Sequence, residues 1–206
     1  DHNCESEPVR AGANRRCDTE LLRNADFEAG PTVWREESTY PGIAGIEDVI
    51  VSRSDGSLGS HPFVAPPSGN DYVAWLGGVP NDNGSIFHVN ALQDIVIPLE
   101  ATAIVLSGQI QISTEEDQDV EYDTLSISLQ TDLSAWEFDL KPAAGVETVF
   151  FSNTDPTSGW QAFEARLANP SDVTTLRGRT VTLWIDSRTD EDLLQQAGSS
   201  CAKRGP

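Results

Sequence analysis

The residues that could take part in catalysis are scattered along this chain. The histidines His2, His61 and His88 show neither the HExxH pattern of a zinc helix nor the ligand spacing of other metal sites. The sequence contains no GxSxG nucleophile elbow. Acidic residues are so numerous that carboxylate pairs carry little information about glycoside hydrolysis. The sequence therefore predicts a protein that is not an enzyme.

Sugar binding is a second kind of chemistry to consider. It requires aromatic side chains beside polar ones, because a pyranose presents apolar C–H patches and a rim of hydroxyls. In residues 180–185 the odd positions are apolar and are expected to face inward, which turns Trp184 outward. The candidate ligand-binding residues are Trp184, Tyr122, Gln109 and Gln111, with Ser126 and Ser128 beside them if their strands are neighbours. The alternative is that Trp184 packs beneath a loop or an arm.

The three cysteines, Cys4, Cys17 and Cys201, indicate an oxidising compartment. A Cys4–Cys17 bond would close a short loop, worth roughly 3 kcal/mol in the chain-entropy model, but both pairings with Cys201 are equally allowed. The remaining cysteine would then be either a buried thiol or half of an inter-chain disulfide. Because the chain has no methionine and no apolar run long enough to span a bilayer, we expect a mature secreted chain without membrane insertion.

The charge balance narrows the range of partners. The chain has 33 acidic and 13 basic residues, for a net charge of -20. A phosphate backbone is bound by basic patches, so nucleic acid is excluded as a partner, and an anionic membrane surface is disfavoured. Such acidity suits a solvated surface or the binding of divalent cations.

The elements expected to hold these residues are strands. Alternation with a period of two is clearest in residues 103–113 and 122–129, and in the second stretch Leu125, Ile127 and Leu129 share the buried face. Trp136, Phe138 and Leu140 continue the inward set. Further strands are expected at 21–28, 32–37, 45–52, 71–77, 86–89, 95–97, 150–151, 160–167 and 180–185.

This number of strands predicts a two-layer all-β architecture. A chain of 206 residues is long enough for one such domain with its own core. We expect an N-terminal arm over residues 1–19, a β-sandwich over 20–187 and a C-terminal arm over 188–206. The only weak helix candidate is 190–197.

Several short motifs follow one another in a defined order. Residues 24–30 read Asn-Ala-Asp-Phe-Glu-Ala-Gly and precede Trp34, and the later motifs are Ser-Gly-Asn-Asp-Tyr at 68–72, Leu-Gly-Gly at 76–78, Asp-Thr-Leu-Ser-Ile at 123–127 and Gly-Trp-Gln at 159–161. This series resembles the galactose-binding-like jelly-roll modules that are appended to secreted bacterial hydrolases and metalloproteases and that include many carbohydrate-binding modules. The resemblance covers about residues 20–187 and implies a jelly-roll β-sandwich.

The same resemblance implies a structural calcium ion. In such modules calcium commonly lies where the first strand's Glu, the carbonyls of a Ser-Gly-Asn-type turn and an Asp near the chain end converge. By position, Glu28 matches the first ligand, Asn70 and Asp71 lie at the turn, and Asp26 is near enough to contribute. Calcium prefers six to eight such oxygen ligands. The alternative is that Asp26 and Glu28 form a solvated strand end.

The chain departs from the family after Ile185. Members usually end with a strand that carries an aromatic residue, then Asp, then alternating apolar residues, whereas residues 191–198 are largely polar. A missing last strand would leave a sheet edge open for pairing with another chain. We therefore expect a non-catalytic, secreted module that binds a glycan or a cell-surface polymer, with structural calcium. The alternative is a subunit of an extracellular fibre or matrix that pairs with copies of itself by strand donation or inter-chain disulfide.

Overall fold

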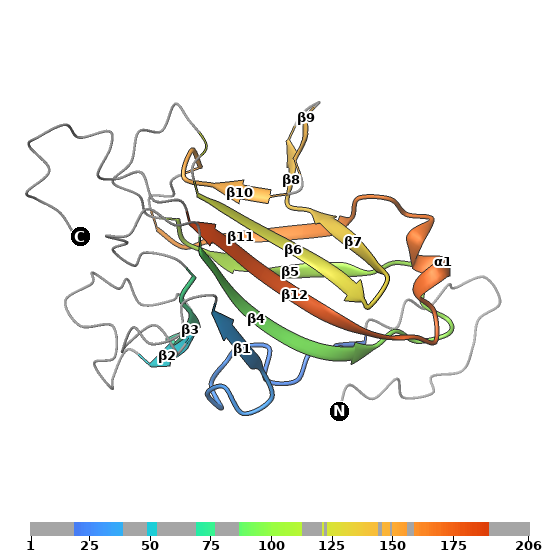
Figure 1. Cartoon of the computed structure of the whole chain (residues 1–206), viewed down its shortest axis with the longest axis horizontal. Coiled ribbons are helices and arrows are strands. Elements are labelled where there is room, and N and C mark those ends of the chain that lie inside the picture. The colour runs from blue at the N-terminus through green and yellow to red at the C-terminus, as the bar shows by residue number, and fades with distance from the viewer. Residues whose placement is uncertain are drawn as a thin grey trace, which may run out of the picture.

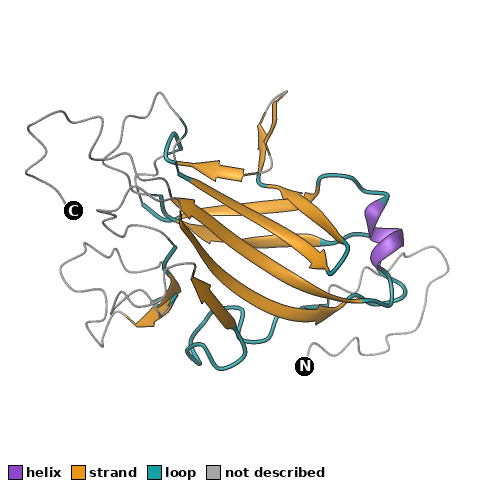
Figure 2. Ribbon diagram, viewed as in Figure 1, coloured by secondary structure: helices purple, strands orange, loops and turns teal. Residues whose placement is uncertain are grey.

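The computed structural model describes residues 19–38, 49–52, 69–76, 87–112, 121, 123–143, 146–148, 150–155 and 159–189. Strands dominate this part of the chain, with one short helix (Figure 2). The elements are β1 (Arg35–Ser38), β2 (Ile50–Ser52), β3 (Tyr72–Ala74), β4 (Phe87–Val96), β5 (Val105–Ile110), β6 (Thr124–Thr131), β7 (Ser134–Asp139), β8 (Lys141–Ala143), β9 (Val146–Thr148), β10 (Phe150–Ser152), β11 (Gln161–Leu167), α1 (Asp172–Leu176) and β12 (Thr180–Thr189). The prediction of an all-β fold is confirmed.

Most strands belong to one antiparallel sheet in the order β1-β4-β12-β6-β7-β11-β5, and β10 also pairs with β6. The longest pairing joins β4 to β12, from Val96 opposite Thr180 to Phe87 opposite Thr189. β2 pairs with β3, and β8 with β9. The long central strands β4, β12 and β6 thus form the middle of the sheet.

The sheet curls between β7 and β11. These strands meet at Asp139 opposite Arg166 and at Phe138 opposite Leu167, after which β11 continues beside β5. In Figure 1, β11 and β5 pass behind β6 and β12. The described strands therefore form a front layer of β1, β4, β12, β6 and β7 and a back layer of β11 and β5.

The hydrophobic core lies between these layers, and strand alternation decides which residues enter it. The predicted inward residues Ile127 and Leu129 are 4% and 0% exposed, and Phe138 and Leu140 are equally buried. The cluster of buried apolar residues comprises Trp34, Val49, Ile50, Val89, Ala91, Ile95, Ile97, Ile104, Ile127, Leu129, Phe138, Leu140, Ala165, Leu167, Val173, Leu176, Val181 and Leu183. Both layers and α1 contribute to it.

Residues 21–28, predicted as a strand, form a loop. Asn24 and Phe27 have φ values of 52° and 64°, a left-handed backbone that strands do not contain. The Asn24 amide donates to the Gly30 carbonyl at 2.7 Å and accepts from the Ala29 N–H at 2.9 Å. Trp34 Nε1 donates to the Asn24 carbonyl at 3.1 Å, and its ring lies 5.1 Å from that of Phe27. The motif at 24–34 is therefore a compact loop closed by its own side chains.

The prediction of two separate strands at 86–89 and 95–97 is wrong, because the structure has one ten-residue strand, β4, over Phe87–Val96. Three polar residues, Asn90, Gln93 and Asp94, lie between the two predicted strands, and the first two of them are buried. Asn90 and Gln93 are 6% and 2% exposed. Tertiary hydrogen bonds satisfy them, so the polar stretch continues the strand.

The strand predicted at 180–185 extends to Thr189, beyond the expected domain boundary at 187. It lies between β4 and β6, with a paired strand on each side, so β12 is not at the open sheet edge that we expected from a missing last strand. The described sheet ends instead at β1 and β5.

Helix α1 was not predicted; it buries Val173 and Leu176, while the weak helix candidate at 190–197 lies outside the described residues. Within the described chain, no helix has the length and apolar character needed to cross a membrane.

Candidate ligand-binding face

The register of β4, β12 and β6 defines a face of the front layer that points away from the core. Residues opposite each other in an antiparallel ladder point to the same side. Trp184 lies opposite Leu92 of β4 and Ser128 of β6, and its neighbour Leu183 is a core residue. We call the outward residues of these three strands the outer face, and its central members are His88, Asn90, Leu92, Asp94, Thr182, Trp184, Asp186, Arg188, Ser126, Ser128 and Gln130.

Trp184 occupies the middle of this outer face. Its neighbour Leu92 is 0% exposed and Ser128 is 6% exposed, whereas Trp184 is only half-buried. Of these three neighbours, the indole is the one that keeps an accessible surface. The prediction that alternation turns Trp184 outward agrees with this register.

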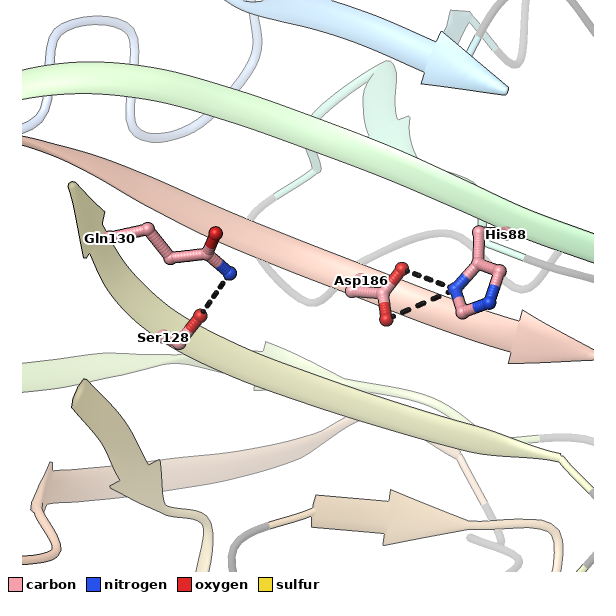
Figure 3. A network of polar contacts seen from close by, with 4 residues as sticks. All are labelled: His88, Ser128, Gln130 and Asp186. Atoms are coloured by element: carbon pink, nitrogen blue, oxygen red, sulfur yellow. Dashed lines mark hydrogen bonds and ion pairs between the residues drawn. The ribbon is translucent and has the colours of Figure 1, made fainter. Parts of the chain in front are cut away.

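At one end of the outer face, His88 and Asp186 form a pair. His88 Nδ1 lies 3.0 Å and 3.3 Å from the two carboxylate oxygens of Asp186 (Figure 3). Their side chains are 40% and 24% exposed. With its amide nitrogen turned towards this carboxylate, the buried Asn90 also donates to Asp186. Asp186 is thus an acceptor whose orientation is fixed from the neighbouring strand β4.

Towards the other end, hydroxyl and amide groups continue the polar surface. Thr182 Oγ1 donates to Asp94 Oδ1 at 2.7 Å, across the β4–β12 ladder. On β6, Gln130 Nε2 donates to Ser128 Oγ at 2.9 Å (Figure 3). The half-buried indole of Trp184 therefore lies between two groups of hydrogen-bonding side chains, an arrangement that suits a ligand with both apolar and hydroxyl surfaces.

The other predicted ligand-binding residues are placed elsewhere. Gln109 is exposed on β5, and Gln111 is half-buried just after that strand. β6, β7 and β11 separate β5 from β12 in the sheet. The structure thus brings Trp184 together with the serines of β6 but not with the two glutamines, and Tyr122 lies outside the described residues.

The residues predicted to bind calcium meet at one corner of the molecule. Glu28 Oε1 accepts hydrogen bonds from the N–H groups of Asp71 and Tyr72, both at 2.9 Å. Asn70 Nδ2 donates to the Asp26 carbonyl at 3.3 Å, and Ser52 Oγ donates to Asp71 Oδ2 at 2.5 Å. These bonds fasten the 24–34 loop to the start of β3.

Over the described residues, no three His, Cys, Asp or Glu side chains are grouped so that they could hold a metal ion. The hydrogen bonds of this corner account for its geometry with the protein's own groups. A calcium ion at Glu28 would need further oxygen ligands from outside this set, because the ion takes six to eight. Calcium therefore stays a prediction. The disulfide pairing does so too, since Cys4, Cys17 and Cys201 lie outside the described residues.

Sequence reasoning missed the pair formed by His88 and Asp186. The two residues are 98 positions apart, and neither belongs to a recognisable motif. They become neighbours because β4 and β12 pair with Arg188 opposite His88 and with Asp186 opposite Asn90. The only signal in the sequence was that each stands at an outward position of its strand.

Comparisons with protein-family models, with curated proteins and with solved structures give no match for this chain. The resemblance to galactose-binding-like modules therefore stays a hypothesis that rests on the residues quoted above.

Proposed function

We propose that this protein is a non-catalytic extracellular binding module of the jelly-roll type, and that its outer face binds a glycan or a cell-surface polymer. The observation that carries the proposal is the half-buried Trp184 between the Asp186 group and the Thr182–Asp94 pair. An indole stacks on the apolar C–H face of a pyranose, and flanking acceptors and donors bind its hydroxyls. The curled two-layer sheet supports the jelly-roll assignment.

The charge of the face favours a neutral sugar over an acidic one. Asp94 and Asp186 flank Trp184 along the sheet, whereas Arg188 and His88 lie beyond Asp186 at the end of the face, and the whole chain carries a net charge of -20. A uronic acid or a sulfated sugar would be repelled by these carboxylates. The hydroxyls of a neutral hexose instead donate well to a carboxylate, since charge-assisted hydrogen bonds are stronger than neutral ones.

Affinity electrophoresis through gels that contain neutral or acidic polysaccharides tests this proposal. We expect at least one neutral polysaccharide to retard the protein, Trp184→Phe to keep part of the retardation, and Trp184→Ala to abolish it. Leu133→Ala, on the exposed turn between β6 and β7, is the control and should migrate like the wild type. Retention by acidic polymers alone, or equal retention of Trp184→Ala, would contradict the proposal.

Structural calcium at Glu28 is the second part of the proposal, and the resemblance of residues 24–30 and 68–72 supports it. A ligand present at 100 times its Kd stabilises the folded state by about 2.7 kcal/mol. We expect calcium to raise the thermal unfolding temperature of the wild type but not of Glu28→Gln, whose amide oxygen still accepts from Asp71 and Tyr72. An unfolding temperature that does not respond to calcium in the wild type would refute this part.

A further inference from the structure

β5 forms one end of the described sheet, and its composition is unusual for an exposed edge. It pairs with β11 on one side, and no other described strand lies beside it. Val105 is 44% exposed, and Ser107, Gly108 and Gln109 are exposed as well. An edge strand offers N–H and C=O groups to any other strand that can approach it. In the described part of the molecule, the edge of β5 that faces away from β11 is therefore available for pairing with another strand.

Edge strands are usually protected from such pairing by charges, proline or a bulge. β1, at the opposite end of the sheet, follows this rule with Arg35, Glu36 and Glu37. β5 has the sequence Val-Leu-Ser-Gly-Gln-Ile, and residues 101–112 contain no charge and no proline, although 22% of the chain is charged. The lack of protection at β5 is thus specific to this edge.

We propose that β5 pairs antiparallel with β5 of a second copy of the chain, so that one sheet continues across a two-fold axis. Because this axis is perpendicular to the sheet, the inner faces of both copies lie on the same side. Even-numbered residues of one β5 therefore lie opposite even-numbered residues of the other. Leu106, Gly108 and Ile110 then meet each other on the inner side, and Val105, Ser107 and Gln109 meet on the outer side. β5 is thereby complementary to itself.

The uncharged sequence of β5 favours a second copy as the occupant. A basic or an acidic peptide would find no opposite charge along residues 101–112 to pair with. A second copy presents the same uncharged strand, whose sequence is complementary to itself, while its overall charge of -20 opposes the association. Because an edge contact of six residues per copy is small, the dimer is a weak one. Its association strengthens as salt screens the repulsion between the two acidic bodies.

Sedimentation velocity of the full chain over a range of concentrations tests this pairing, with a reductant present so that cysteines form no covalent dimer. We expect a reversible dimer whose association constant rises between about 0.05 and 0.5 M salt, where the screening length falls severalfold. Ser107→Lys places a charge at the centre of the edge, and we expect it to weaken association about tenfold or more, as lysine does on protected edges. Its fold is maintained because Glu164 lies opposite on β11.

Ala162→Lys is the matched control, since it adds the same charge at an exposed position one strand further in, opposite Gln109. It should dimerise like the wild type. Thermal unfolding of both variants checks that each is folded. A wild type that stays monomeric at millimolar concentration, or two lysine variants with equal association constants, would overturn the proposal.

Discussion

Gln93 provides a quantitative test of how the N-terminal loop is attached to the sheet. It lies on the inner side of β4, opposite the core residue Leu183, and is 2% exposed. Its side-chain amide accepts from the Arg23 N–H at 2.7 Å and donates to the Arg23 carbonyl at 2.9 Å. One buried side chain thus satisfies both backbone groups of a residue 70 positions away.

Gln93→Leu preserves the size of the side chain and removes both hydrogen bonds. Each bond contributes about 1 kcal/mol net, and leaving a buried backbone group without a partner costs about 1–3 kcal/mol. Because the contact at Arg23 is only partly buried, water can reach these groups and lowers that cost. We therefore expect Gln93→Leu to reduce the free energy of unfolding by about 2–4 kcal/mol.

Urea unfolding followed by tryptophan fluorescence measures this loss, and the midpoint should fall at an unchanged slope. Gln130→Leu is the matched control: Gln130 is half-buried on the outer face and makes a single bond to Ser128. We expect it to cost less than about 1 kcal/mol. Equal losses for the two variants would refute the assignment of Gln93 as the attachment point.

Two further pairs of substitutions test the backbone and the core by the same urea assay. Gly178 (φ 70°) and Gly69 (φ 77°) have a left-handed backbone, so alanine at either position should lower the free energy of unfolding by about 1–2 kcal/mol. At Gly178 the new Cβ would lie 2.7 Å from the Leu99 side chain, but this adds little because Leu99 is 74% exposed and can move. A neutral effect at both would contradict the assigned backbone. Leu129→Ala should cost about 2–5 kcal/mol at 0% exposure, whereas Leu133→Ala, 93% exposed, should cost under about 0.5 kcal/mol; similar losses would contradict the core.

The alternation of apolar residues predicted the existence and the inward residues of β6 and β12, though not their exact ends, because both strands have one buried and one outward face. Ile127 and Leu129 on β6, and Val181 and Leu183 on β12, are core residues. On such strands the side-chain period of two is visible in the sequence itself. This is also why the outward position of Trp184 could be predicted.

The prediction failed where tertiary contacts satisfy polar groups. Asn90 and Gln93 interrupted the apolar pattern of β4, yet Asp186 and the Arg23 backbone satisfy them. Residues 21–28 were predicted as a strand, but the side chain of Asn24 closes them into a loop. The local sequence pattern does not show which distant residue will satisfy a polar side chain.

The candidate face could be predicted only in part, because its residues come from strands far apart in the sequence. Trp184 and Ser128 were placed on one face on the condition that their strands are neighbours, which β12 and β6 are. The same condition fails for Gln109, because β5 lies in the back layer. The pair of His88 and Asp186 required the register of β4 against β12.

Ligand binding at the outer face is tested most directly by the Kd of the wild type and of Trp184→Ala for a neutral oligosaccharide, measured by titration calorimetry. Circular dichroism first checks that both proteins are folded. We expect the wild type to bind and Trp184→Ala to lose about 1–3 kcal/mol of binding free energy, the scale of burying one large side chain. Leu133→Ala, on an exposed turn away from the outer face, should bind as the wild type does. Undiminished binding by Trp184→Ala would contradict the assignment of the outer face as the ligand-binding surface.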